Sequence, residues 1–225
     1  MKKIMMIAAM MVATVSANAQ FEPGTFSLQP KLGGTVSWLS NMPKVRTDHT
    51  DLDKSPVAGF TIGGEAEYQI AKAFSLAAGV NYSMQGSGWA DYEEKIGDVK
   101  YELKDSKIEL GYINIPIVAN IYLFKGFAIK SGVQFGFLTS ANEKLNFKIS
   151  DGNSSSNTDV DESIKDQCEK FDISIPIGVS YQVPTVPVVI DGRFNLGLKK
   201  VNKHELDKNY KNMVVQVTVG YKFKL

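Results

Sequence analysis

Apolar and polar residues alternate strictly along eight long stretches of this chain. In the first, Phe26–Trp38, the apolar residues Phe26, Leu28 and Leu32 are separated by Ser27, Gln29 and Lys31. Successive side chains of a β-strand point to opposite faces, so a period of two predicts strands with one apolar face. The other seven stretches are Val57–Ile70, Phe74–Gln85, Ile108–Phe124, Phe127–Thr139, Phe171–Val183, Val188–Leu198 and Met213–Leu225. The sequence therefore predicts an all-β chain of eight strands.

The strands and their connections have the lengths of a membrane barrel. Each strand covers roughly 11 to 15 residues, whereas about 9 to 11 span a bilayer and about 5 to 6 are usual in soluble proteins. Short and long links alternate, as periplasmic turns and extracellular loops do. Both termini of the mature chain are then expected in the periplasm. The short links are 71–73, 125–126 and 182–187, and the long ones are 39–56, 87–107, 140–170 and 199–210. The charged stretch Asp91–Glu109 is read as a solvated rim, with a hairpin that extends the two flanking strands above the membrane as the alternative.

Three prolines lie inside predicted strands, namely Pro30, Pro116 and Pro176. Proline has no N–H to donate to a neighbouring strand, so it is confined to edges and irregular positions of sheets. We expect a β-bulge at each of the three, because a bulge absorbs an unpaired residue.

The first 19 residues have the three parts of a secretory signal peptide. Lys2 and Lys3 precede a short apolar run, which ends before the small residues Ala17-Asn18-Ala19. This pattern predicts cleavage before Gln20, with residues 20–225 forming the barrel domain. The apolar run is shorter than the roughly 20 residues of a transmembrane helix. The 25 basic and 24 acidic residues of the chain give no indication of nucleic-acid binding.

The composition of the two strand faces indicates which one meets lipid. The polar face is rich in Gly, Ser, Asn, Gln and Thr and poor in the Lys and Glu that a water-facing surface carries. This favours an inside-out barrel over a soluble one such as a lipocalin. Eight strands enclose a lumen just wide enough for side chains, so charges there must pair. We expect a structural lumenal ion-pair network of Lys31, Glu65, Glu67, Lys130, Asp172, Asp191, Arg193, Lys222 and Lys224. An ion path is the alternative role for these charges.

Aromatic residues lie near the ends of many strands on the apolar face. Such residues form girdles at the two membrane interfaces of outer-membrane barrels. The expected girdle consists of Phe26, Trp38, Phe74, Tyr82, Phe127, Phe137, Tyr181, Tyr221 and Phe223.

Several segments together resemble a known family. These are the signal peptide ending in Ala-Gln, the strand Tyr112–Ile117, the glycine-rich alternating strands and the terminal Tyr221–Leu225. They are similar to the outer membrane protein beta-barrel domain proteins, which include PorT-like and small porin-family barrels of OmpA/OmpX-type architecture. The resemblance covers the whole mature chain. It implies an eight-stranded antiparallel up-and-down transmembrane β-barrel in the outer membrane of a Gram-negative bacterium, inserted by the barrel-assembly machinery.

No pattern of residues indicates catalysis, a cofactor or a metal site. His49 and His204 fall in predicted loops, away from every strand, and are read as solvated. The stretch Asp151–Glu162 places oxygen donors at EF-hand spacing, but Ser156 replaces the glycine of that motif, so a flexible acidic loop is favoured. Cys168 is read as an incidental thiol in a polar loop.

Three functions remain open. The favoured hypothesis is a structural or interaction barrel, with a filled lumen and loops that contact an envelope or secretion-system protein. A small-solute porin is the alternative, and a lipid A-modifying enzyme is the third. Outer-membrane lipid is the expected surrounding of the barrel in each case.

Overall fold

The computed structural model describes residues 22–41, 45–46, 51–151, 154–203 and 209–225. Residues 1–21 lie outside this part, so the signal peptide stays a prediction. The strands are β1 Phe26–Ser40, β2 Val45–Arg46, β3 Asp51–Leu52, β4 Lys54–Ala71, β5 Phe74–Trp89, β6 Tyr92–Ile96, β7 Val99–Phe124, β8 Phe127–Ser150, β9 Ser155–Ser163, β10 Phe171–Gln182, β11 Val188–Gly197, β12 Lys211–Tyr221 and β13 Phe223–Lys224. A single 3-10 turn, η1 Lys165–Gln167, precedes β10.

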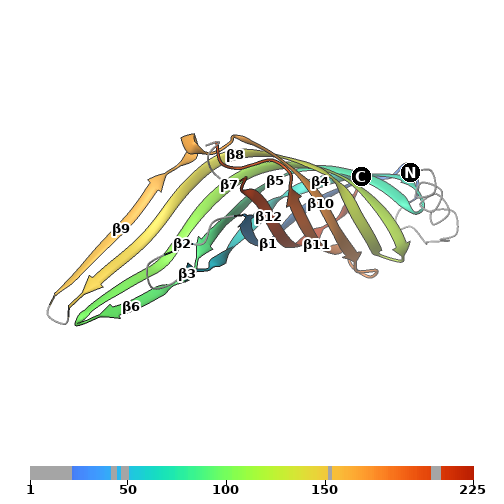
Figure 1. Ribbon diagram of the computed structural model, residues 1–225. Coiled ribbons are helices and arrows are strands. Elements are labelled where there is room, and N and C mark those ends of the chain that lie inside the picture. The colour runs from blue at the N-terminus through green and yellow to red at the C-terminus, as the bar shows by residue number, and fades with distance from the viewer. Residues whose placement is uncertain (1–21, 42–44, 47–50, 152–153, 204–208) are drawn as a thin grey trace.

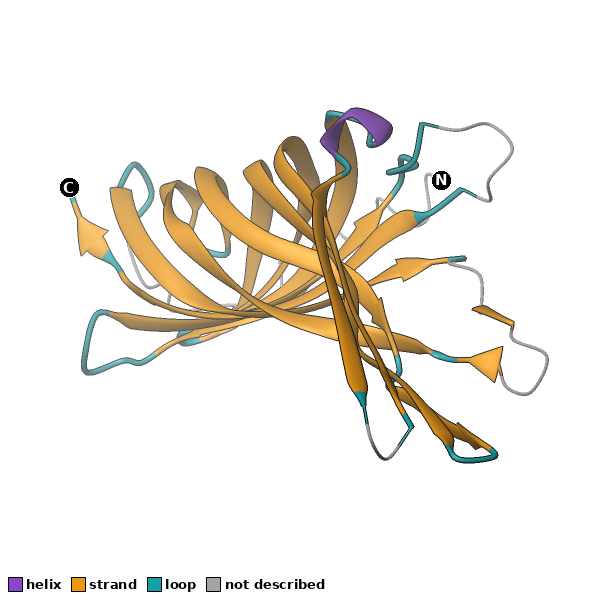
Figure 2. Ribbon diagram, turned by 90° about the vertical axis from the view of Figure 1, so that its left-hand side faces the viewer, coloured by secondary structure: helices purple, strands orange, loops and turns teal. Residues whose placement is uncertain are grey.

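Eight of these strands close into a ring, which confirms the predicted antiparallel barrel. The order around the ring is β1, β4, β5, β7, β8, β10, β11 and β12, and β12 pairs with β1 to complete it. Neighbours in the ring are neighbours in sequence and run antiparallel, as in an up-and-down barrel. Figure 2 shows the strands curving round the barrel, with η1 (purple) beside their ends.

Side chains alternate across the wall of the ring as the sequence predicts. Leu32 is 64% exposed on the outer face and its neighbour Lys31 is 4% exposed in the lumen. Similarly, Ile62 is 54% exposed while Thr61 is 2% exposed. An apolar exterior around a polar interior is the reverse of a soluble barrel, and it is the arrangement that lipid requires.

None of the three strand prolines lies in a bulge, so that expectation is wrong. Pro116 pairs with Gln134 of β8 in continuous register. Towards β5, the ladder skips Pro116 and Ile115 without shifting register. Pro30 and Pro176 likewise pair on one side and interrupt the ladder on the other. A residue in a strand directs its N–H towards only one of the two neighbouring strands. Proline therefore removes one hydrogen bond from the ladder on that side and leaves the ladder on the other side intact.

The predicted long links 87–107 and 140–170 are mostly strand. For 87–107 this agrees with the alternative of extended strands above the membrane, and for 140–170 it corrects the assignment as a loop. β7 has 26 residues and β8 has 24, so both continue well beyond the ring. β6 pairs with the extension of β7, and β9 pairs with that of β8 over nine residue pairs. The resulting four-stranded sheet, here called the blade, comprises β6, β9, residues 99–107 and residues 143–150. In Figure 1 it projects as a single layer from the end of the barrel opposite the C-terminus.

Candidate functional site: the lumen, the mouth and the blade

Five charged side chains form a continuous cluster in the middle of the lumen. Arg193 on β11 reaches across to Glu65 on β4 with two hydrogen bonds, of 2.6 Å from Nη1 and 2.7 Å from Nη2. Its Nε donates to Asp191 Oδ1 at 2.7 Å. Lys31 Nζ donates to Glu65 Oε1 at 2.5 Å, and Lys130 donates to Asp191. This central cluster links β1, β4, β8 and β11 with hydrogen-bonded ion pairs, and its side chains are nearly fully buried.

A second, smaller cluster closes the lumen at the end with the short turns. Lys222 Nζ donates to Glu67 Oε2 at 2.8 Å, and Ser75 Oγ donates to Glu67 Oε1 at 2.6 Å. The Tyr122 hydroxyl also donates to Glu67. Tyr122 lies on β7 in the same phase as the buried Asn114 and Asn120. A tyrosine among inward-facing Asn and Pro residues is the signal that identifies it.

Two residues of the expected network lie apart from both clusters. Lys224 is exposed on β13, beyond the end of the ring, and forms no ion pair with another described residue. Asp172 is buried, but its carboxylate accepts from the Ile173 N–H at 2.7 Å and from Asn212 Nδ2 at 3.1 Å. No described Lys or Arg forms an ion pair with it. The clusters therefore comprise seven of the nine expected residues, joined by Ser75 and Tyr122.

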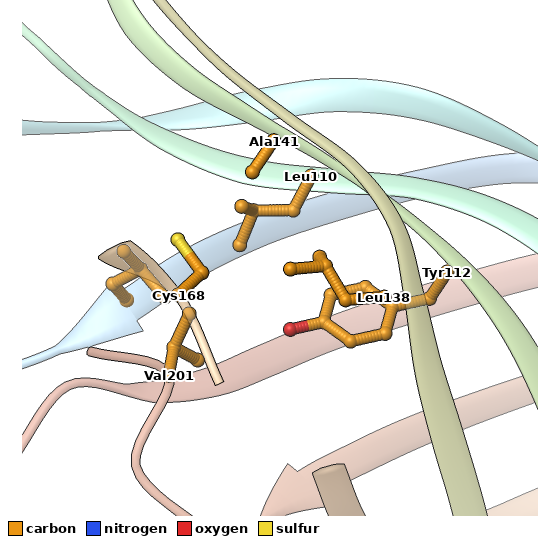
Figure 3. Close-up of a cluster of buried hydrophobic side chains, with 7 residues drawn as sticks. Leu110, Tyr112, Leu138, Ala141, Cys168 and Val201 are labelled. Carbon is orange, nitrogen blue, oxygen red and sulfur yellow. The ribbon is translucent and has the colours of Figure 1, made fainter. Parts of the chain in front are cut away.

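An apolar cluster fills the end of the lumen that lies below the blade. Figure 3 shows Leu110, Tyr112 and Leu138 from β7 and β8 converging on Cys168 and Val201 from two connecting segments. The full mouth cluster is Leu39, Leu110, Tyr112, Leu138, Ala141, Cys168 and Val201. The two segments are tied together by the Glu169 N–H, which donates to the Val201 carbonyl at 2.6 Å. They cover this end of the barrel.

Cys168 is buried in the mouth cluster, which corrects the reading of it as a thiol in a polar loop. Its side chain is 6% exposed although Asp166, Gln167 and Glu169 surround it in sequence. Burial raises the pKa of the thiol, so Cys168 is held as a neutral, small apolar side chain. A cluster assembled from five separate segments leaves no periodic trace in the sequence, and the polar neighbours of Cys168 conceal its position.

The expected girdle residues lie on the outer face in two bands. Phe26, Phe74, Phe127, Tyr181, Tyr221 and Phe223 begin or end strands near the short turns. Trp38, Tyr82 and Phe137 lie towards the blade. Contacts join some of them across strands: Phe26 packs on Tyr68 with ring centroids 4.7 Å apart, and Tyr221 packs on Phe223 at 4.6 Å.

The polarity of the two faces inverts where the ring becomes the blade. On β8, Leu145, Phe147 and Ile149 share the face of Ala141, which points into the mouth cluster. Leu103 and Tyr101 of β7 pair directly opposite Phe147 and Ile149. The inward side of the blade therefore carries an apolar strip flanked by Glu94 and Glu143, whereas the inward side of the ring is polar.

The outward side of the blade carries charged side chains that form ion pairs with one another. Glu102 lies between Lys100 and Lys104, with N–O distances of 3.0 and 2.9 Å. Their hydrogen bonds lower the pKa of Glu102 to about 2, with Lys104 contributing most. Glu109 is held in the same way by Lys107 and Lys144, each at 2.9 Å. A charged outer face cannot lie against hydrocarbon, so the blade stands outside the membrane core.

The acidic stretch that resembles a calcium loop is part of this sheet. Ser155–Ser163 forms β9, an extended strand in which Glu162 pairs opposite Glu143. A strand cannot wrap its alternate residues around one ion, so the described part Ser155–Ser163 does not form an EF-hand loop. Asn153 lies outside the described residues. His49 and His204 lie outside the described residues.

Comparison with known proteins identifies the family. The model of the outer membrane protein beta-barrel domain family matches residues 18–203. Among solved structures, Neisserial surface protein A is 16% identical, with 88% of this chain and 97% of that chain covered and a TM-score of 0.43. Ail of Yersinia pestis, in complex with the heparin analogue sucrose octasulfate, is 14% identical, with 89% and 99% covered and a TM-score of 0.41. A comparison with curated proteins finds no match.

No helix in the described part of the chain combines the length and the apolarity needed to cross a bilayer. The family model covers well over half of the chain, and its fold is the antiparallel ring described above. The chain belongs to the outer membrane protein beta-barrel domain family, and the outer membrane is its location.

Proposed function

We propose that this protein is a membrane-anchored interaction protein, with the barrel as the anchor and the blade as the contact surface. The observation that carries the proposal is the inverted polarity of the blade. Tyr101, Leu103, Phe147 and Ile149 form an apolar strip on one side of a sheet that stands outside the hydrocarbon. Phe147 is 37% exposed. Exposed apolar strips rimmed by charge are typical of protein contact sites.

The orientation follows from the same proposal. Short turns of outer-membrane barrels face the periplasm and long loops face the exterior. The C-terminus lies at the end opposite the blade. We therefore place the blade outside the cell and the C-terminus in the periplasm, after cleavage of the expected signal peptide and insertion by the barrel-assembly machinery. Partners of the blade are then an envelope protein, a secretion assembly or a component outside the cell.

The filled lumen supports an anchor rather than a porin. The two ion-pair clusters and the mouth cluster occupy successive levels of the ring. An eight-stranded barrel has no room for both a layer of long side chains and a water column. The role that we assign to the lumenal charges is structural, and the proposal includes no catalysis, so lipid A modification is not part of it.

Site-specific photo-crosslinking in intact cells tests the proposed contact surface. A photoreactive amino acid replaces Phe147 on the apolar side of the blade, and in a second strain it replaces the adjacent Lys148 on the charged side. Both positions are exposed and lie on the same strand, so the pair is matched in access. The proposal expects a discrete protein adduct from position 147 and a much weaker one from position 148. Equal adducts from both positions, or none from position 147, would contradict it.

A further inference from the structure

A layer of amide side chains separates the central cluster from the mouth cluster. It surrounds a cavity of about 10 Å³. A cavity of this size admits one water molecule or one small ion. The residues that line it are Gln85, Asn114, Gln134, Gly136, Asp172, Ser174, Asn195, Asn212 and Val214. Apart from Asp172, none of these side chains carries a charge.

Three of the side-chain amides around the cavity donate to serine hydroxyls. The Nδ2 of Asn114 and the Nε2 of Gln85 both donate to Ser83 Oγ, at 2.7 Å each. Gln134 Nε2 donates to Ser174 Oγ at 3.3 Å. The amides of Asn114 and Gln85 thus donate to a residue that does not line the cavity. The Oδ1 of Asn195 is left without a donor, although its side chain is 3% exposed.

The Asp172 carboxylate lines the same cavity as this unpartnered oxygen. Glu65, Glu67 and Asp191 each pair with a Lys or Arg, but Asp172 does so with no described residue. The ammonium of Lys199 is the nearby cation, and it lies over the Phe171 ring, 5.2 Å from the centroid. The three cations of the central cluster are hydrogen-bonded to the carboxylates of that cluster. An uncompensated buried carboxylate is costly in such surroundings.

We propose that this cavity binds one monovalent cation of the size of sodium, held by the Asp172 carboxylate and the Asn195 Oδ1. Neighbouring amide oxygens of the layer complete its coordination. Oxygen donors of this kind suit hard cations. A single positive charge balances the single carboxylate, whereas a divalent ion would leave a net charge buried. A water molecule would satisfy the acceptors but would not compensate the charge.

The bound ion links two strands of the barrel, β10 and β11, next to the mouth cluster. Asp172 is the second residue of β10, which follows the segment that carries Cys168, and Asn195 lies on β11. Coordination by both residues holds the start of β10 against the ring. The ion therefore stabilises the closed mouth and has no part in transport.

Thermal unfolding of the folded barrel in zwitterionic detergent tests the site. Sodium chloride is compared with choline chloride at equal ionic strength, since choline is too large for the cavity. Above the dissociation constant, each tenfold rise in sodium should raise the Tm by on the order of 3 to 6 °C. Asp172→Asn should abolish this dependence and should melt above the wild type in choline, because it removes the uncompensated charge.

Asp191→Asn is the matched control, since it alters a lumenal carboxylate that already has cation partners. It should lower the Tm and keep the dependence on sodium. Asn195→Ala should shift the dependence to higher sodium concentrations, which keeps the test informative if Asp172→Asn fails to fold. Equal Tm values of the wild type in sodium and in choline would overturn the proposal. An unchanged sodium dependence in Asp172→Asn would also overturn it.

Discussion

Arg193 is the side chain on which the lumen most depends. It is 4% exposed and hydrogen-bonds two carboxylates on different strands, Glu65 and Asp191. Its planar guanidinium meets Glu65 in a two-pronged arrangement that a lysine cannot reproduce. Removal of this side chain leaves two buried carboxylates with only Lys31 and Lys130 to balance them.

Arg193→Met should therefore lower the free energy of unfolding by about 3 to 5 kcal/mol, because breaking a buried ion pair strands its partners. Urea unfolding of the barrel in lipid vesicles measures this loss. Lys104→Met is the control, because it breaks an exposed ion pair of the blade and should cost less than about 1 kcal/mol. Similar losses of unfolding free energy in both variants would contradict the conclusion that the lumenal cluster contributes strongly to stability.

The residue scale also shows what the sequence could predict about the site. Charges on the polar face of strands must meet in a narrow lumen, so Lys31, Glu65 and Arg193 were identifiable from alternation alone. Which charges pair depends on register and on the levels at which side chains lie. Asp172 has the same inward phase as Asp191 but accepts a hydrogen bond from Asn212 in place of an ion pair with a described lysine. The alternation of polar and apolar residues does not tell at which level along the barrel axis a side chain lies.

Among elements, β7 and β8 combine two environments in one strand. Their ring halves are apolar outside and their blade halves are charged outside, with register shifts at Gly111/Tyr112 and Lys104/Lys107. A bulge adds one residue and so changes the phase of alternation. This explains why a scan for period two identifies the ring halves and reads the blade as loops. β9 was harder still to identify, because Val160 is its one apolar residue and its pairing is imposed by β8.

Because the strand prolines pair on one side only, the effect of substitutions at and next to Pro116 on stability can be predicted. Pro116→Val should change stability by less than about 1 kcal/mol, since the new N–H faces the gap in the ladder with β5. Ile117→Pro, one residue along, should cost several kcal/mol because it removes a bond from the intact ladder with β8 inside the membrane. Unfolding in urea compares the two. A large loss in Pro116→Val would show that proline itself is needed at this position.

The whole molecule has three zones with different polarity. The ring is apolar outside and polar inside, the mouth is closed by an apolar cluster, and the blade is charged outside and apolar inside. The ring was predictable from sequence because each strand reports its own two faces. The mouth and the β9 side of the blade were not, because both depend on segments that meet only in the folded chain. The central claim that follows is a sealed barrel that serves as an anchor.

Conductance across a planar bilayer tests that claim most directly. Purified, folded protein is added to one side of the bilayer, and insertion is checked independently by protection of the ring from protease. A general porin added to the same bilayers serves as the positive control. The filled lumen predicts insertion without stable current steps. Reproducible unitary conductance from the inserted wild-type protein would contradict the sealed barrel and would favour the porin alternative.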